Sequence, residues 1–411
     1  MKHEYLAGLV LAVLVTAGCI DDPAAPEPEP EGGPITLAAA IAQSGRHGEL
    51  GNAVARGYRL AVEILNERGG VRGRPVELVL RDDGSDPETS ARLYAEFAAS
   101  DTIDALLGPY SSPITTTVLA VTEAAGIPLV APAAAAPELW AGRQRQWSAQ
   151  LLNPAPGYLG GSVEVAALVG ARDVALVWED TAFPASVAGG VRAVAAAHGL
   201  DIVLAASYAV GAADHEALLA AARDAGATLF IGGGYATDAI EFTRAATAVG
   251  YRPLLMSLLL GPAEPTFPDE VGEAGRCVMG NAPWDPTIRT SGFISDSETM
   301  VQRYEAAYGT TPGYHPAAGF GAVELLAEGI DQAISATGDA DRSAIRDFLF
   351  TAMTETVLGP YSVYPLGDLQ AGAQRALTGL QVQWQDDGAG GLTRRIIHPW
   401  AVANATPCLM R

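Results

Sequence analysis

Short apolar segments that predict β-strands alternate along most of this chain with segments whose apolar residues recur at helical spacing. The expected strands are residues 35–41, 76–80, 103–107, 128–131, 174–178, 202–206, 229–231 and 253–256. The expected helices between them are residues 53–68, 88–98, 113–124, 158–169, 185–198, 215–225 and 237–249. Strands separated by helices form right-handed β–α–β units, so the pattern predicts parallel sheets with helices on their faces.

A stretch rich in proline at residues 153–157 divides the alternation into two series of the same architecture. This stretch predicts a crossing strand or hinge, not a disordered linker. The chain continues with three expected helices and then three expected strands, at residues 297–308, 316–337, 342–353, 361–364, 380–384 and 395–397. The length allows two domains. The predicted fold class is therefore α/β, with two doubly wound parallel-sheet lobes.

The beginning of the chain has the composition of a segment that directs export. Lys2 and His3 precede an apolar run at residues 6–15, and small residues follow it. This order predicts a secretory signal peptide at residues 1–18. The apolar run is too short to cross the ~30 Å hydrocarbon core of a bilayer.

Cys19 directly follows Ala-Gly, which resembles the lipobox of bacterial lipoproteins, although Thr16 stands where those proteins usually have leucine. The resemblance implies a signal that is cleaved before Cys19 and a lipid on that cysteine. Ordinary secretion, with Cys19 removed or incidental, is the alternative. Residues 19–34 alternate Pro with Glu, which predicts an extended, solvated tether. We expect a cell-envelope protein that works outside the cytoplasm and is lipid-anchored to a membrane.

The overall charge limits the possible partners. The 411 residues carry a formal net charge of −22, which disfavours direct binding to nucleic acid or to an anionic bilayer surface. Apolar residues make up 49% of the chain, enough for a sizeable core. The three cysteines are Cys19, Cys277 and Cys408, so at most one disulfide forms if Cys19 carries lipid.

No motif in the sequence supports catalysis. A Gly-x-Ser-x-Gly elbow is absent, Ser111 has no identifiable histidine partner, and the six histidines lack a metal-binding spacing. The glycine-containing loop at residues 45–51 matches neither nucleotide-binding pattern. We therefore expect no enzymatic activity, no cofactor and no metal.

A series of ordered motifs covers residues 35–400 and resembles the substrate-binding proteins of ABC transporters that bind branched-chain amino acids, which are type I periplasmic binding proteins. The motifs are Gly51, Gly57, Ala61, Asn66, Gly69-Gly70, Gly73-Arg74-Pro75, Asp82-Asp83, Asp86-Pro87, residues 107–112, Gly126-Ile127-Pro128, Ala131-Pro132, Pro137-Glu138-Leu139, residues 232–235, residues 318–330, residues 359–362 and Gly367-Asp368. Each motif is weak alone, and their order is specific.

The resemblance implies two lobes that are joined by three crossings and close on a ligand like a hinge. Lobe one would combine residues 35–155 and 284–370, and lobe two residues 156–283 and 371–411. Cys277 and Cys408 would then both belong to lobe two, where a disulfide between them becomes possible.

Ser111 and Ser112 follow an expected strand and precede an expected helix that begins at Pro113. This position offers hydroxyl groups, free backbone N–H groups and the positive end of a helix dipole, all of which suit a carboxylate. Spacing alone favours another interpretation, in which Ser112 only caps the helix. The family resemblance favours ligand binding, because its matching serine holds the ligand carboxylate, and it places Tyr110 in the same motif.

The other expected ligand contacts match the family less well. Ala133 and Ala135 lie in a loop whose family counterpart holds the ligand with a Thr or Ser side chain, so only backbone groups remain here. Tyr235 and Phe183 match aromatic ligand contacts, and packing roles are the alternatives. Glu264 stands later than the family's usual acidic residue, and a solvated loop carboxylate is its alternative.

These departures affect the expected ligand. A buried ammonium without a carboxylate costs several kcal/mol. If Glu264 points away from the cleft, a carboxylic acid or amide with an apolar body fits better than an amino acid.

We therefore expect a monomeric solute-binding protein that captures a small organic solute, an amino acid or a related carboxylate or amide, and delivers it to an ABC permease. A lipoprotein of the same fold that activates a partner protein or senses a ligand in the cell envelope is the alternative.

Overall fold

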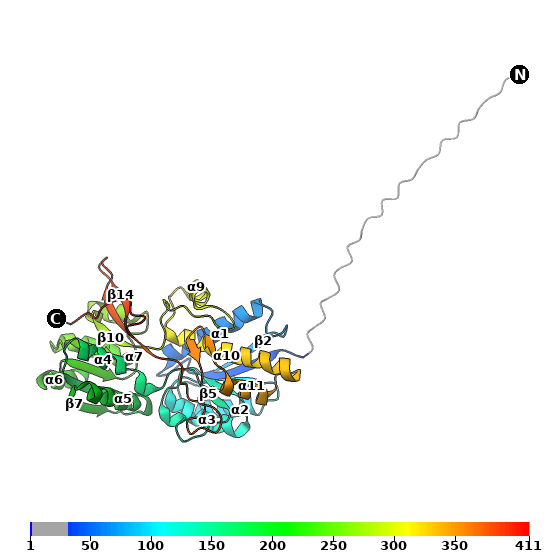
Figure 1. The fold of residues 1–411 in the computed structure, drawn as a ribbon, viewed down its shortest axis with the longest axis horizontal. Helices are drawn as coiled ribbons and strands as arrows, with labels where there is room; N and C mark the ends of the chain where they lie inside the picture. Colours follow the sequence, from blue (N-terminus) through cyan, green and yellow to red (C-terminus); the bar gives the residue numbers. More distant parts are fainter. Residues whose placement is uncertain (2–31, 411) are drawn as a thin grey trace. The chain divides into compact units, whose positions relative to one another are not determined.

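The computed structural model describes residue 1 and residues 32–410, and the body from Pro34 onward forms one compact unit (Figure 1). Within residues 32–410 the strands form a five-stranded sheet, a seven-stranded sheet and a two-stranded sheet. The two large sheets and the helices on them are the two lobes that the sequence predicts. The signal peptide, Cys19 and most of the tether lie outside the described residues.

Lobe one is the five-stranded sheet together with the helices of residues 48–125 and 297–351. Its sheet is parallel throughout, in the order β2 (Val76–Asp82), β1 (Ile35–Ile41), β3 (Ala105–Leu107), β4 (Leu129–Ala131) and β5 (Ser148–Gln150). The helices are α1 (Gly48–Glu67), α2 (Pro87–Ala98), α3 (Ser112–Ala125), α9 (Ser297–Tyr308), α10 (Tyr314–Thr337) and α11 (Arg342–Thr351). The small sheet of β11 (Thr354–Thr356) and β12 (Gly359–Tyr361) lies beside α10.

Lobe two is the seven-stranded sheet with its helices. The sheet order is β14 (Leu392–His398), β13 (Leu380–Asp386), β10 (Val278–Ala282), β9 (Leu255–Leu258), β8 (Leu229–Gly233), β6 (Asp173–Glu179) and β7 (Asp201–Tyr208). Its helices are α4 (Gly160–Leu168), α5 (Ala182–His198), α6 (His215–Asp224), α7 (Ala236–Ala248) and α8 (Phe267–Val271). Five strands are parallel, and β13 and β14 add an antiparallel edge. In Figure 1 the helices α4–α7 (green) surround this sheet.

Some strands differ from the sequence prediction. β5 and β10 were not expected, because β5 has a single apolar residue, Ala149, and β10 contains Gly280 and Asn281. The prediction of a strand at residues 361–364 is wrong, because β12 ends at Tyr361. β12 pairs with β11, and a turn at Val357 and Leu358 connects the two strands. Such short strands are held by their neighbours and have no apolar periodicity of their own.

Two glycines let α1 and α10 approach closely. A Cβ atom on Gly57 of α1 would lie 2.1 Å from the carbonyl oxygen of Pro316, and one on Gly319 of α10 would lie 2.3 Å from that of Val54. Only glycine leaves room for the backbones at these two points. The contact fixes the beginning of α10, where Tyr314 and His315 lie, relative to the first sheet.

A buried carboxylate joins α10 to the segments around it. Glu324 is fully buried and accepts hydrogen bonds from the backbone N–H groups of Val357 (2.7 Å), Ile294 (3.1 Å) and Ser295 (3.3 Å). Burial raises its pKa to about 8, against the smaller opposite effect of these three donors. The fold therefore favours a protonated Glu324 at neutral pH.

This shift predicts that stability depends on pH. The folded-state pKa lies above the ordinary value of 4.5, so the contribution of Glu324 is fully present below about pH 4.5 and is lost as the pH rises through 8. We expect the free energy of unfolding in urea to fall between pH 5 and pH 8. In Glu324→Gln, which cannot titrate, this part of the slope should disappear. An equal slope in both proteins would contradict the assignment.

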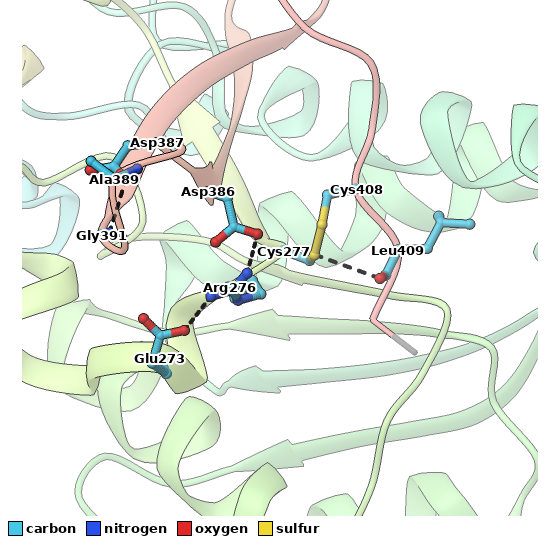
Figure 2. A network of polar contacts seen from close by, with 9 residues as sticks. All are labelled: Glu273, Arg276, Cys277, Asp386, Asp387, Ala389, Gly391, Cys408 and Leu409. Carbon is cyan, nitrogen blue, oxygen red and sulfur yellow. Dashed lines mark hydrogen bonds and ion pairs between the residues drawn. A yellow bond between two sulfur atoms is a disulfide. The ribbon is translucent and has the colours of Figure 1, made fainter.

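The C-terminal tail is attached to lobe two by a disulfide between Cys277 and Cys408 (Figure 2). Their Cα atoms lie 5.2 Å apart. Gln383 of β13 bridges the same two segments, because its side-chain amide donates to the carbonyl oxygens of both cysteines at 2.9 Å. Beside the disulfide, Arg276 forms ion pairs with Glu273 and Asp386 (Figure 2).

We expect Cys277→Ser with Cys408→Ser to lower the free energy of unfolding by ~2–5 kcal/mol, since the disulfide closes a long loop in the unfolded chain. Thermal unfolding with and without a reductant measures this. The reductant should destabilise the unchanged protein and leave the double variant unaffected. A reductant effect of equal size in both proteins would contradict a formed disulfide.

Candidate ligand-binding site

Each sheet has a point where the strand order reverses, and ligands of open α/β sheets bind beside the carboxyl ends of the strands at such points. In lobe one the reversal lies between β1 and β3, and in lobe two between β6 and β8. The segments that follow these four strands contain Arg46 and His47, Tyr110 to Ser112, Phe183, and Tyr235. They are brought together by the fold, although 188 residue positions separate His47 from Tyr235.

A cavity lies where these segments meet. Seven of the eight expected ligand contacts line it: Tyr110, Ser111, Ser112, Ala133, Ala135, Phe183 and Tyr235. Five further residues complete the lining: Leu152, Tyr158, Leu260, Tyr314 and His315. The space open to the centre of a water molecule is about 20 Å³, enough for about one water. The entry of an organic solute therefore requires the lining residues to move apart.

Ser111 combines an unusual backbone conformation with a buried hydroxyl group that has no partner. Its φ of 80° lies in a region that L-residues rarely adopt. Its side chain is buried, with 4% of the residue exposed, and its Oγ has no hydrogen-bond partner. It immediately precedes α3 and does not cap that helix with its side chain.

Ser112 is tied to the neighbouring loop. Its Oγ accepts hydrogen bonds from the backbone N–H groups of Ala135 (3.2 Å) and Ala136 (3.1 Å). The interpretation of Ser112 as the helix cap is wrong, because α3 begins at Ser112 itself. The hydroxyl proton of Ser112 remains available to a ligand, since both bonds use the oxygen as acceptor.

Glu264 is the expected contact that does not line the cavity. Its carboxylate lies 2.6 Å from Nδ1 of His315, whose Nε2 lies 3.3 Å from the hydroxyl of Tyr110. The side chain of Glu264 is 12% exposed, so it is not a solvated loop carboxylate. Glu264 therefore contacts His315, which lines the cavity, and does not line the cavity itself.

Only weak signals in the sequence pointed to the five further lining residues. Leu152 and Tyr158 flank the proline-rich stretch at residues 153–157, and Leu260 follows the β9 strand. Tyr314 and His315 open α10, two residues before the expected beginning of that helix. The signals in the sequence were the proline-rich stretch at residues 153–157, which predicts a crossing strand or hinge, and the beginning of the helix that became α10.

The tyrosines of the lining are hydrogen-bond donors at neutral pH. Burial raises the pKa values of Tyr110, Tyr158, Tyr235 and Tyr314 above the ordinary value of 10. Each therefore keeps its hydroxyl proton. Among the described residues no group of three or more His, Cys, Asp or Glu side chains is arranged to hold a metal ion. Within the same residues no helix is long and apolar enough to cross a membrane.

A family model described as periplasmic binding protein matches residues 34–389, well over half of the chain. The chain belongs to the periplasmic binding protein family. A solute-binding role and a location outside the cytoplasm follow from this membership. The resemblance to the type that binds branched-chain amino acids is also confirmed, because the Leu/Ile/Val-binding protein homolog 7 of Brucella abortus is 27% identical over 359 residues, covering 82% of this chain and 86% of the relative.

Solved structures share the fold of this periplasmic binding protein. A branched-chain amino acid transporter substrate-binding protein from Streptococcus pneumoniae, in complex with isoleucine, has a TM-score of 0.74 at 20% identity and covers 89% of this chain and 100% of its own. A solute-binding protein of an ABC transporter from Rhodopseudomonas palustris, in complex with 3,4-dihydroxybenzoic acid, has a TM-score of 0.73 at 16% identity and covers 87% and 94%.

A contact that the sequence did not reveal joins the two lobes beside the cavity. Arg46 of lobe one forms an ion pair with Glu179 of lobe two, whose side chain is completely buried. The guanidinium carbon of Arg46 also lies 4.9 Å from the ring centre of Tyr235. His47 packs between Tyr110 (5.4 Å) and Tyr235 (4.9 Å), and burial together with Arg46 lowers its pKa to about 4, so it is neutral here.

We expect Arg46→Ala to shift this binding protein toward an open form. Without Arg46 the carboxylate of Glu179 would be buried and unpaired, a situation that costs ~3–5 kcal/mol when burial is complete. Separation of the lobes relieves this cost by hydrating Glu179. Arg46 is partly exposed, so we expect at least about a tenfold lower ratio of closed to open molecules.

Small-angle X-ray scattering measures this shift as a larger radius of gyration. The matched control is Arg92→Ala, which removes an exposed pair with Glu96 within α2. Identical scattering from Arg46→Ala and the unchanged protein would contradict a role of the ion pair in closure.

Proposed function

We propose that this protein captures a small organic solute that carries a carboxylate, by closure of its two lobes, and delivers it to an ABC permease. The observation that carries the proposal is the unpartnered, buried hydroxyl of Ser111 at the N-terminus of α3, inside a cavity between the two sheets. Membership of the periplasmic binding protein family supports it. The ligands named for the two similar structures, isoleucine and 3,4-dihydroxybenzoic acid, are both carboxylates.

In the proposed mechanism the solute first meets lobe one. Ser111 and Ser112 offer their hydroxyl protons to the carboxylate, and the N-terminus of α3 adds the positive end of its dipole. Lobe two then closes and brings Phe183 and Tyr235 against the solute, while Arg46 meets Glu179. The permease would recognise this closed form.

The proposal includes the division of the chain that the sequence suggests. Lobe one comprises residues 35–155 and 284–370, lobe two comprises residues 156–283 and 371–411, and the three crossings are hinges. A lipid on Cys19 would hold the monomeric protein at the membrane near its permease.

A second candidate is a lipoprotein of the same fold that activates a partner protein or senses a ligand in the envelope. The small volume of the cavity favours it, because a site that does not open would not take up a solute.

Thermal unfolding of the protein with a panel of solutes tests the proposal. The panel contains aliphatic amino acids, their 2-keto acids, aromatic carboxylates, amides and short peptides. A solute at one hundred times its Kd adds about 2.7 kcal/mol to the free energy of unfolding, and the midpoint then rises by several degrees.

Ser111→Ala should abolish the shift, and Ser343→Ala, which changes an exposed serine of α11, should leave it intact. If no solute shifts the midpoint, solute capture is refuted and the second candidate is favoured.

A further inference from the structure

The cavity contains no acidic side chain, which bears on the class of solute. The twelve lining residues, all within the described part of the chain, include neither Asp nor Glu. Glu264, which the sequence offered as the partner of an ammonium, is bound to His315. A ligand ammonium would therefore be buried without an ionic partner, which is strongly unfavourable. This inference rests on the proposed function and concerns the ligand of the same site.

Half of the residues that line the cavity carry an aromatic ring. Tyr110, Tyr158, Phe183, Tyr235 and Tyr314 line it together with the ring of His315. Phe183 meets the ring of Tyr158 edge-on at 5.4 Å and lies 6.1 Å from that of Tyr235, tilted by 52°. Rings in these arrangements offer both faces and edges to a further ring, which favours a flat aromatic body over a branched aliphatic one.

A second polar atom of the cavity lacks a partner. The hydroxyl of Tyr158 has no hydrogen-bond partner, and only 1% of this residue is exposed. The backbone of Tyr158 is held, since its carbonyl oxygen accepts a hydrogen bond from the side chain of Gln381 at 2.7 Å. The hydroxyl can thus bind a ligand atom without rearrangement of the backbone. A buried polar group that finds no partner is unfavourable, so a ligand that satisfies it is favoured.

The cavity therefore has a fully buried hydroxyl without a partner on each lobe, that of Ser111 on lobe one and that of Tyr158 on lobe two. We propose that the ligand is an aromatic carboxylate that carries a ring hydroxyl and has no ammonium group. Its carboxylate binds Ser111 and the N-terminus of α3, its ring lies among the aromatic side chains, and its hydroxyl pairs with Tyr158. Tyr158 then determines specificity for the hydroxyl.

Isothermal titration calorimetry tests this with benzoate, the three monohydroxybenzoates, phenylalanine and leucine. We expect at least one hydroxybenzoate to bind about tenfold more tightly than benzoate, from one additional hydrogen bond in a buried site. Phenylalanine and leucine should bind at least about a hundredfold more weakly than that hydroxybenzoate, because their ammonium finds no carboxylate.

The matched variant is Tyr158→Phe, which keeps the ring and removes only the hydroxyl. It should bind benzoate as the unchanged protein does and lose the preference for the hydroxybenzoate. Glu264→Gln should not weaken the binding of either amino acid, because Glu264 does not hold the ammonium. If Tyr158→Phe keeps the preference, the role of Tyr158 is refuted.

The two proposals fail in distinguishable ways. If leucine or phenylalanine binds more tightly than every hydroxybenzoate, the ligand class is refuted while solute capture stands. If the aromatic acids, the amino acids and the wider solute panel all fail to bind, solute capture is refuted as well.

Discussion

The site of this protein depends on the direction of its parallel strands. Right-handed β–α–β connections place the carboxyl ends of the parallel strands at the same edge of each sheet, and the following helices begin there. The segments after β3 in lobe one and after β6 and β8 in lobe two bring Tyr110, Ser111, Ser112, Phe183 and Tyr235 to the cavity. Residues from distant parts of the chain lie close together because the parallel strands of both lobes are arranged in this way.

The contact between the lobes and the cavity share a side chain. Tyr235 lines the cavity and also lies under the guanidinium of Arg46, which pairs with the buried Glu179. Under the proposed function, a solute in contact with Tyr235 would also affect the group that joins the lobes. Occupation of the site and closure would then be coupled through direct contacts.

Strands with continuous apolar runs were predictable because a strand that is buried on both faces needs apolar residues at nearly every position. β1, β6 and β8 belong to this class. The short strands β5, β10 and β11 were not predictable, since hydrogen bonds to neighbouring strands hold them and their own residues are mixed. The contact of α1 with α10 at Gly57 and Gly319 was equally hidden, because a glycine in a helix does not reveal which backbone approaches it.

The sequence by itself determined the two α/β lobes through local periodicity, and its resemblance to a known family indicated seven residues that the structure places around the cavity. Only the tertiary structure decided which side chains stand beside them. Tyr158 lines the cavity from the segment after the proline-rich stretch at residues 153–157, and His315 lines it from the beginning of α10. Glu264 forms a hydrogen bond with His315. Such partners are chosen by packing between segments far apart in the chain, where sequence spacing carries no information on distance.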